Sequence, residues 1–345
     1  MCNIAGYAGR KRAAPILLEM LRKQQHFDGG ACAGIATIHD GRLYYRKVLG
    51  DVETLMNTTD ALNLPGTVGI AHTRPGGSAA TYSFAHPFIT EDEVMAGITN
   101  GTMRGIGYQQ KAQDAADFLE NEGYRFRGEA FIEKSAFPRI KNGSFVSCVE
   151  VRLNLVHYYV SQGMSIPEAM IKTAERCYTD SVLGIMSVNT PDRFYILRTT
   201  RPAAVMKADD GVYVASTRMA FPEDTKGEVS QLPIFSPCEI TKNGVTVSSE
   251  RMTDCEPVAE LTEAALSLGY ERICALLHGK ADSPLIFDDL EFAVWNDMRD
   301  LFPGSHSLQQ DARLVYDVIY RLKEEGKLKT EVRDLGSKKR IYMWI

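Results

Sequence analysis

The second residue of the chain is a cysteine, in a sequence that opens MCNIAGYAG. Once Met1 is removed, which the small side chain of Cys2 favours, this residue carries both a thiol and a free α-amine. An α-amine titrates near ~7.7–8.0 and a thiol near ~8.5, so at neutral pH a useful fraction of the amine can accept the thiol proton. Cys2 would then be a nucleophile with its own general base. A cysteine at this position can also arise by chance, so the rest of the chain has to decide.

Asn100 and Gly101 follow an apolar run at 94–99 that we predict to be a strand. Attack on a carboxamide creates an oxyanion, which needs preorganised hydrogen-bond donors. Asn100 offers a side-chain amide, and Gly101 offers a backbone N–H that can approach closely because glycine has no Cβ. The same dipeptide is also a common turn, so the sequence leaves both interpretations open.

Arg74 follows a second predicted strand at 67–73. A guanidinium at the end of a buried strand can hold a substrate carboxylate with two parallel hydrogen bonds. The alternative is an ion pair at the protein surface.

The composition is that of a globular protein: 44% of the 345 residues are hydrophobic, 24% are charged, and the net charge is -5. This charge argues against a general binder of polyanions, and no apolar run approaches the ~18 residues of a membrane span. The seven cysteines are irregularly spaced without a CxxC pair, and the seven histidines have no metal-ligand spacing. We therefore expect a cytoplasmic protein without a disulfide framework, metal or cofactor.

The predicted elements place the candidate residues at the ends of strands. A buried strand at 3–9 precedes an amphipathic helix at 13–25, and Asp40-Gly41 joins a hairpin. Two helices at 148–162 and 166–177 interrupt the strands, which favours two sheets with helical layers. Further strands are predicted at 182–188, 194–198, 204–208, 212–215, 238–241 and 245–247.

The composition changes near residue 250, and the pattern from 256 onward is helical. A strongly amphipathic helix at 309–325 precedes strands at 328–335 and 340–344. We predict a first domain at 2–255 and a second at 256–345, with a winged-helix-like core at 282–345.

Four segments in order resemble the class II glutamine amidotransferases, and in particular the glutaminase half of glucosamine-6-phosphate synthase. They are the opening Cys2-Asn-Ile-Ala-Gly-Tyr-Ala-Gly, Ala71-His72-Thr73-Arg74, Ala85-His86-Pro87-Phe88 and Asn100-Gly101. The resemblance covers roughly residues 2–250 and implies an α+β fold, the four-layer αββα sandwich of N-terminal-nucleophile hydrolases. It also implies that Cys2 is the nucleophile, with Asn100 and Gly101 as the oxyanion hole.

The same resemblance gives a candidate substrate-binding set of Thr73, Arg74, His86 and Glu150, although His72 and His86 also fit structural framework roles. The chain departs from the family in this region. Pro75-Gly76-Gly77-Ser78 replaces the loop that covers glutamine in relatives. Cys148 stands where relatives have the Asp that pairs with the substrate ammonium, and Glu150 could compensate only from another position on the helix.

Two function classes remain open. The first is an amidohydrolase that releases ammonia from glutamine or a related amide for an acceptor handled by a protein partner. The second is a non-catalytic sensor of amides or amino acids with a winged-helix output domain. Nucleic-acid binding through 311–345 is possible but weakly indicated, because nine Lys or Arg residues there face six Asp or Glu.

Overall fold

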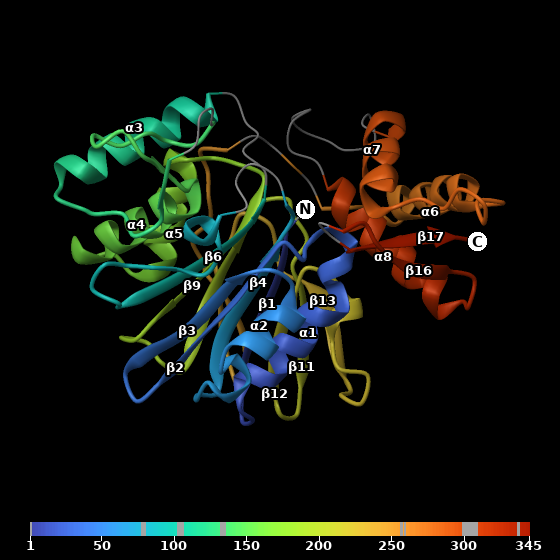
Figure 1. Cartoon of the computed structure of the whole chain (residues 1–345), viewed down its shortest axis with the longest axis horizontal. Helices are drawn as coiled ribbons and strands as arrows, with labels where there is room; N and C mark the ends of the chain where they lie inside the picture. Colours follow the sequence, from blue (N-terminus) through green and yellow to red (C-terminus); the bar gives the residue numbers. More distant parts are fainter. Residues whose placement is uncertain are drawn as a thin grey trace.

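The computed structural model describes residues 2–76, 81–101, 107–131, 136–255, 258, 260–298, 310–336 and 339–345. Of the residues named above, Met1, Gly77 and Ser78 lie outside these ranges. Two antiparallel sheets form the centre of the first domain (Figure 1).

The first sheet has seven strands. In spatial order they are β13 (Gly227–Gln231), β11 (Ala204–Ala208), β12 (Gly211–Ala215), β1 (Asn3–Gly9), β4 (Val68–Arg74), β2 (Cys32–His39) and β3 (Arg42–Leu49). The second sheet has six, in the order β15 (Gly244–Val247), β14 (Cys238–Thr241), β10 (Arg193–Arg198), β9 (Ser181–Ser187), β6 (Met95–Gly101) and β5 (Phe88–Ile89).

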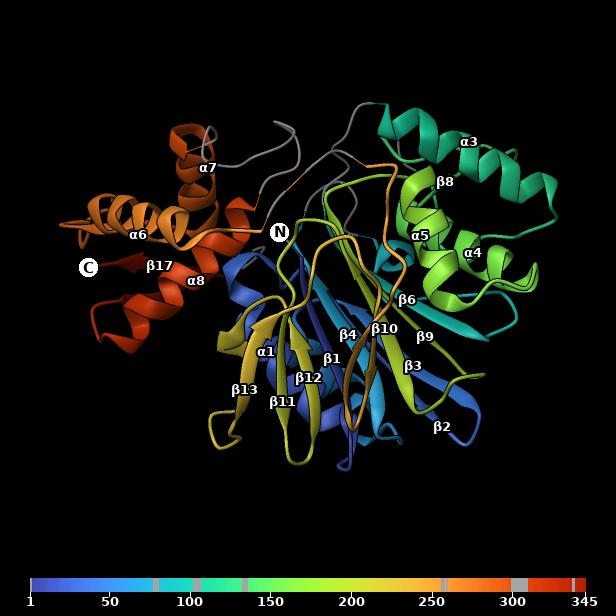
Figure 2. The ribbon, with the colours of Figure 1, turned by 180° about the vertical axis from the view of Figure 1, so that it is seen from behind.

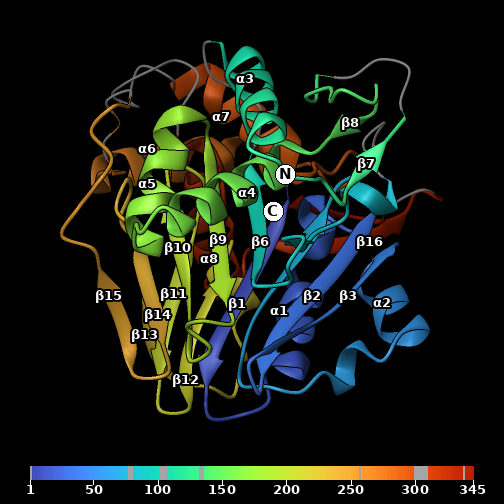
Figure 3. The same cartoon turned by 90° about the vertical axis from the view of Figure 1, so that its left-hand side faces the viewer.

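Helices cover the outer face of each sheet, as Figures 2 and 3 show. The helices α1 (Ala13–Asp28) and α2 (Val52–Thr58) pack on the first sheet. The helices α3 (Tyr108–Asn121), α4 (Cys148–Ser161) and α5 (Ile166–Arg176) cover the second. The predicted four-layer αββα sandwich is therefore confirmed.

The central strand β1 is buried along its whole length, because both of its faces meet apolar layers. Ile4 and Ala8 pack between the two sheets, whereas Ala5 and Tyr7 pack under the helices of the first sheet. Gly6 lets the sheets approach: a Cβ there would lie 2.6 Å from the ring of Phe194. Tight packing of this kind fixes the start of β1, and with it the position of Cys2.

Shorter elements complete the first domain. They are β7 (Glu129–Ala130), β8 (Phe145–Val146) and three short helical turns at Ala61–Asn63, Tyr82–Phe84 and Arg218–Ala220.

The C-terminal part is built from three helices and a hairpin. These are α6 (Glu263–Leu277), α7 (Phe287–Met298), α8 (Asp311–Glu324), β16 (Lys329–Asp334) and β17 (Lys339–Trp344). Leu285 pairs with Met343 beside the hairpin. The apolar stripe of α8 packs against α6 and α7, as its amphipathic sequence predicted.

This C-terminal part packs beside α1 (Figure 1). Phe27 at the end of α1 belongs to its apolar core and makes an edge contact with the ring of Tyr316. In the parts of the chain that the structure describes, no helix is long and apolar enough to cross a membrane. The domain boundary at 255 and the winged-helix character of residues 282–345 remain predictions.

Candidate active site

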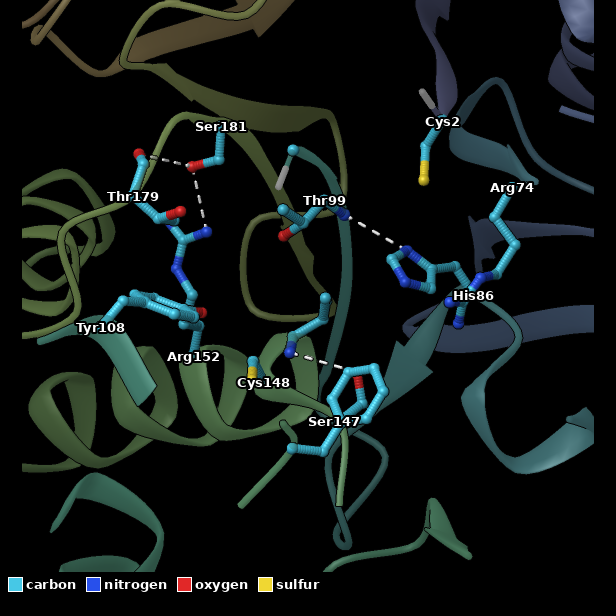
Figure 4. Close-up of a pocket in the computed structure, with 13 residues that line it drawn as sticks. Cys2, Arg74, His86, Thr99, Tyr108, Ser147, Cys148, Arg152, Thr179 and Ser181 are labelled. Atoms are coloured by element: carbon cyan, nitrogen blue, oxygen red, sulfur yellow. Dashed lines mark hydrogen bonds between the residues drawn. The ribbon is translucent and has the colours of Figure 1, made fainter. Parts of the chain in front are cut away.

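A small cavity of about 160 Å³ lies at the edge where β1 and β9 begin and β4 and β6 end. The N-terminus of α4 closes another side (Figure 4). Its lining residues are Cys2, Arg74, His86, Thr99, Gly101, Tyr108, Phe137, Ser147, Cys148, Val149, Arg152, Thr179 and Ser181. The volume is below the roughly 300–1,000 Å³ of sites for drug-sized ligands, so the cavity suits a small molecule.

Cys2 lies immediately before β1, half-buried, and lines the cavity. Figure 4 shows its sulfur pointing from the start of the strand toward the other drawn side chains. Burial raises the pKa of the Cys2 thiol, and the charge of Arg74 partly offsets this effect. A thiol that stays protonated needs a base nearby before it can attack, and a free α-amine on the same residue would supply one.

Gly101 also lines the cavity, at the end of β6. A Cβ on it would lie 2.3 Å from the carbonyl oxygen of Asp180, so the close approach of these strands requires glycine. Asn100 is fully buried and is not among the lining residues. Its Nδ2 donates to Ser216 Oγ at 3.3 Å, and the same hydroxyl accepts from the backbone N–H of Ile4 at 3.0 Å. The hydroxyl of Ser216 thus links the Asn100 amide to the backbone of Ile4 in β1, two residues after Cys2.

Arg74 reaches the cavity from the end of β4, where its Nη1 donates to the carbonyl oxygen of Phe84 at 2.9 Å. His86 lines the cavity as well, and its Nδ1 accepts from the backbone N–H of Thr99 at 3.3 Å. The ring of His86 stacks on that of His72, with centroids 3.8 Å apart. Burial lowers the pKa of His86 well below its ordinary value and that of His72 to about 3. Both rings are therefore neutral near pH 7, and the framework role expected of them fits this geometry.

Two of the predicted substrate-binding residues lie away from the cavity. The hydroxyl of Thr73 is buried and accepts from the backbone N–H of Gly30 at 2.8 Å. The carboxylate of Glu150 accepts from the backbone N–H groups of Arg127 at 2.6 Å and Gly128 at 2.9 Å. Neither is among the lining residues, so the structure brings together Cys2, Gly101, Arg74 and His86, but not Thr73 or Glu150.

Cys148, the position where relatives have an Asp, does line the cavity. It is the first residue of α4, and Ser147 caps the helix by accepting from the backbone N–H of Val149 at 3.3 Å. Burial raises the pKa of the Cys148 thiol to about 12, so it remains neutral.

Arg152 is the lining residue of most consequence that the sequence analysis missed. It lies one helical turn after Cys148 on the same side of α4, and its Nη1 donates to Ser181 Oγ at 3.1 Å. The helical spacing of four from Cys148 was the signal that could have revealed it. Among the residues that the structure describes, no group of three or more His, Cys, Asp or Glu side chains could hold a metal ion.

No model of a protein family matches the chain. The chain is similar to glutamine–fructose-6-phosphate aminotransferase [isomerizing] of Clostridium acetobutylicum, with 30% identity over 218 residues, covering 63% of this chain and 31% of the relative. The enzyme of the same name from Clostridium perfringens is 26% identical over 277 residues, which cover 79% of this chain and 41% of the relative. The chain therefore spans less than half the length of these curated relatives.

Solved structures agree with the fold. Glutamine phosphoribosylpyrophosphate amidotransferase from B. subtilis aligns with a TM-score of 0.57 and 19% identity over 77% of this chain and 52% of that one. A structure described as the allosteric regulatory enzyme of purine biosynthesis aligns with a TM-score of 0.56 and 20% identity over 73% of this chain and 49% of that one. The chain is a homologue of the class II glutamine amidotransferases. In this amidotransferase homologue, Cys2 lies immediately before β1 and lines the cavity.

Proposed function

We propose that the protein is an amidohydrolase that uses Cys2 to release ammonia from a small carboxamide. One observation carries the proposal: Cys2, at the start of the central strand, shares a small cavity with Gly101 and Arg74. A nucleophile, an N–H donor for an oxyanion and a cation for an anionic substrate group then meet in one site.

The reaction follows from these groups once Met1 has been removed. The neutral α-amine of Cys2 takes the thiol proton, and Sγ forms a bond to the carbonyl carbon of the amide. The oxyanion that develops is held by the backbone N–H of Gly101 and, by resemblance to the family, the side-chain amide of Asn100. The C–N bond then breaks, and the protonated amine returns its proton to the leaving nitrogen, which departs as ammonia. Water hydrolyses the thioester, giving a carboxylate and restoring the thiol.

The use of the ammonia is also part of the proposal. The curated relatives are named as glutamine–fructose-6-phosphate aminotransferases. We propose that here the acceptor is handled by a separate protein partner, in the cytoplasm.

A second candidate, the non-catalytic sensor, rests on a direct contact between the C-terminal part and the start of β1. Asn3 Nδ2 donates to the hydroxyl of Tyr316 at 2.9 Å, next to Cys2. A ligand in the cavity could act on the C-terminal helices through this bond.

Ammonia release separates the two candidates. Intact mass first establishes that Met1 has been removed, and the processed protein is then incubated with a panel of small primary carboxamides. The proposal expects ammonia release that is lost in Cys2→Ala and kept in Cys274→Ala, a cysteine on α6 that is also partly buried but outside the cavity. Binding of an amide without ammonia release from any member of the panel would favour the sensor.

A further inference from the structure

The cavity has an unusual balance of charge. Arg74 and Arg152 both line it, and no carboxylate does among the lining residues that the structure describes. In the view of Figure 4, Arg152 lies to the left beside Ser181 and Arg74 to the right beside His86. The site therefore presents two guanidinium groups to a bound molecule.

Both guanidinium groups have unused donors. Arg152 is 2% exposed and donates to Ser181, and among the described residues its buried Nε has no acceptor. Arg74 donates to the carbonyl oxygen of Phe84 and likewise keeps a buried Nε without an acceptor. Within the described parts of the chain, neither has an acidic partner within 4.0 Å. A buried cation without a counter-charge is costly, so this arrangement favours an anion in the cavity.

The N-terminus of α4 adds to the positive potential. Ser147, Cys148 and Val149 bring the first turn of this helix to the cavity, and the positive end of a helix attracts anions. In relatives, by resemblance, an Asp at the position of Cys148 places a negative charge here. In this chain that charge is absent, and Arg152, one turn further along the same side of the helix, brings a positive one.

The two acidic residues that are adjacent in sequence to lining residues have partners elsewhere. Asp180, between the lining residues Thr179 and Ser181, forms an ion pair with Arg201 at 2.6 Å, and both side chains are 2% exposed. Glu150 is held by two backbone N–H groups outside the cavity. A substrate ammonium would therefore meet Arg152 and the end of α4 instead of a carboxylate.

Resting on the amidohydrolase activity proposed above, we propose that the substrate is a short carboxamide whose far end carries anionic groups and no ammonium, with Arg152 binding an anionic group. Its carboxamide lies at Cys2 and Gly101, and its acidic end lies between Arg74 and Arg152. The small volume of the cavity restricts the chain between the two ends to a few carbon atoms.

Three probes of equal chain length test the proposal, because they differ only in the substituent beside the terminal carboxylate. They are L-glutamine with an ammonium, 4-carbamoylbutanoate with a hydrogen, and (2-carbamoylethyl)malonate with a second carboxylate. Juxtaposed like charges cost several kcal/mol. We therefore expect kcat/KM for ammonia release to be at least about 100-fold higher for the malonate than for L-glutamine, with 4-carbamoylbutanoate between them.

Variants of α4 assign the preference to its residues. Arg152→Gln should lower the malonate-to-glutamine ratio of kcat/KM at least about tenfold, and Arg152→Lys should keep part of it. Cys148→Asp should shift the preference toward L-glutamine. Arg176→Gln, which removes an arginine of α5 outside the cavity, is the matched control and should leave the ratio unchanged.

Binding to the Cys2→Ala variant, measured by calorimetry with the same probes, separates this proposal from the proposed activity. If the malonate binds Cys2→Ala most tightly but the unaltered protein releases no ammonia from it, the anionic site is supported and the hydrolase is rejected. Efficient use of L-glutamine over the other probes would overturn the anionic substrate while supporting the hydrolase. Failure of all three probes to bind at millimolar concentration would also overturn it.

Discussion

The chemistry proposed for the site depends on how a few side chains are held beside Cys2. Burial raises the pKa of the Cys2 thiol and lowers those of His72 and His86. Neither histidine is then a cation near neutral pH, and one nitrogen of each ring bonds to the backbone of Thr99. We propose the α-amine of Cys2 as the base, and this role requires the removal of Met1.

Asn100 is the residue whose role the geometry leaves most open to experiment, since its amide is tied to Ser216. If it stabilises the oxyanion, Asn100→Ala should lower kcat by roughly 10²–10³ with little change in KM. Steady-state ammonia release by the folded variant measures this, and Asn189→Ala in the turn after β9 serves as the control. An unchanged kcat would make Asn100 a structural residue only.

At the scale of elements, the geometry of α4 explains why Glu150 lies outside the cavity and why Arg152 lines it. A helix turns by about 100° per residue, so Glu150 lies roughly 200° around the helix from Cys148, whereas Arg152 returns to nearly the same direction. Glu150 accordingly faces Arg127 and Gly128, and Arg152 faces the cavity. A charged residue on a helix is ordinarily solvated, so only the helical spacing of four from Cys148 pointed to Arg152.

The pH dependence of stability tests the placement of Glu150. Desolvation raises the pKa of this carboxyl from 4.5 to about 7. Because the folded protein binds a proton that the unfolded chain has lost, stability from this group is present below pH 4.5 and lost as pH rises to about 7. The free energy of unfolding lost in this way amounts to about 3 kcal/mol.

Unfolding by denaturant between pH 4.5 and pH 7 measures this effect. As pH rises through this range, the free energy of unfolding of the native protein should fall relative to that of Glu150→Gln. Glu122→Gln, at the exposed end of α3, should follow the native protein throughout. Parallel curves for the native protein and Glu150→Gln would contradict the burial of an ionisable carboxyl there.

Most strands of the sandwich could be predicted because their own side chains carry the signal. The run at 3–9 is apolar on both faces, and the hairpin at Asp40-Gly41 is marked by its turn. The helix α2 was missed because only Val52 and Leu55 are buried in its seven residues, too few for a helical period. The strand β13 was missed because its residues are mostly exposed, and it forms by pairing with β11 at the edge of the sheet.

At the scale of the whole molecule, the C-terminal part is joined to the first domain by buried charge as well as by apolar contact. Arg340 forms an ion pair with Asp28 at 2.8 Å and donates to the carbonyl oxygen of Gly29 at 3.2 Å. Lys339 pairs with Asp51 at 3.5 Å. These two cations of the hairpin are thus used within the chain, which favours docking on its own first domain over a nucleic-acid contact.

This junction makes a direct prediction about stability. Arg340 and Asp28 are 2% and 6% exposed, so Arg340→Met breaks a buried ion pair and should lower the free energy of unfolding by about 3–5 kcal/mol. Arg333→Met on β16 removes an exposed ion pair with Glu331 and should change it by less than about 1 kcal/mol. If denaturant unfolding showed that Arg340→Met lowers the free energy of unfolding no more than Arg333→Met does, the junction would not contribute to stability.

The central claim is that Cys2 is the nucleophile of an amide-binding cavity, and covalent capture tests it most directly. The reagent 6-chloro-5-oxohexanoate replaces the carboxamide of 4-carbamoylbutanoate with a chloroketone that alkylates a thiolate held beside it. Intact mass and peptide mapping of the Met1-processed protein should show one label per chain, on Cys2. An excess of 4-carbamoylbutanoate should lower the rate of this labelling. Labelling that persists at the same rate in Cys2→Ala, or that falls on another of the seven cysteines, would contradict the account.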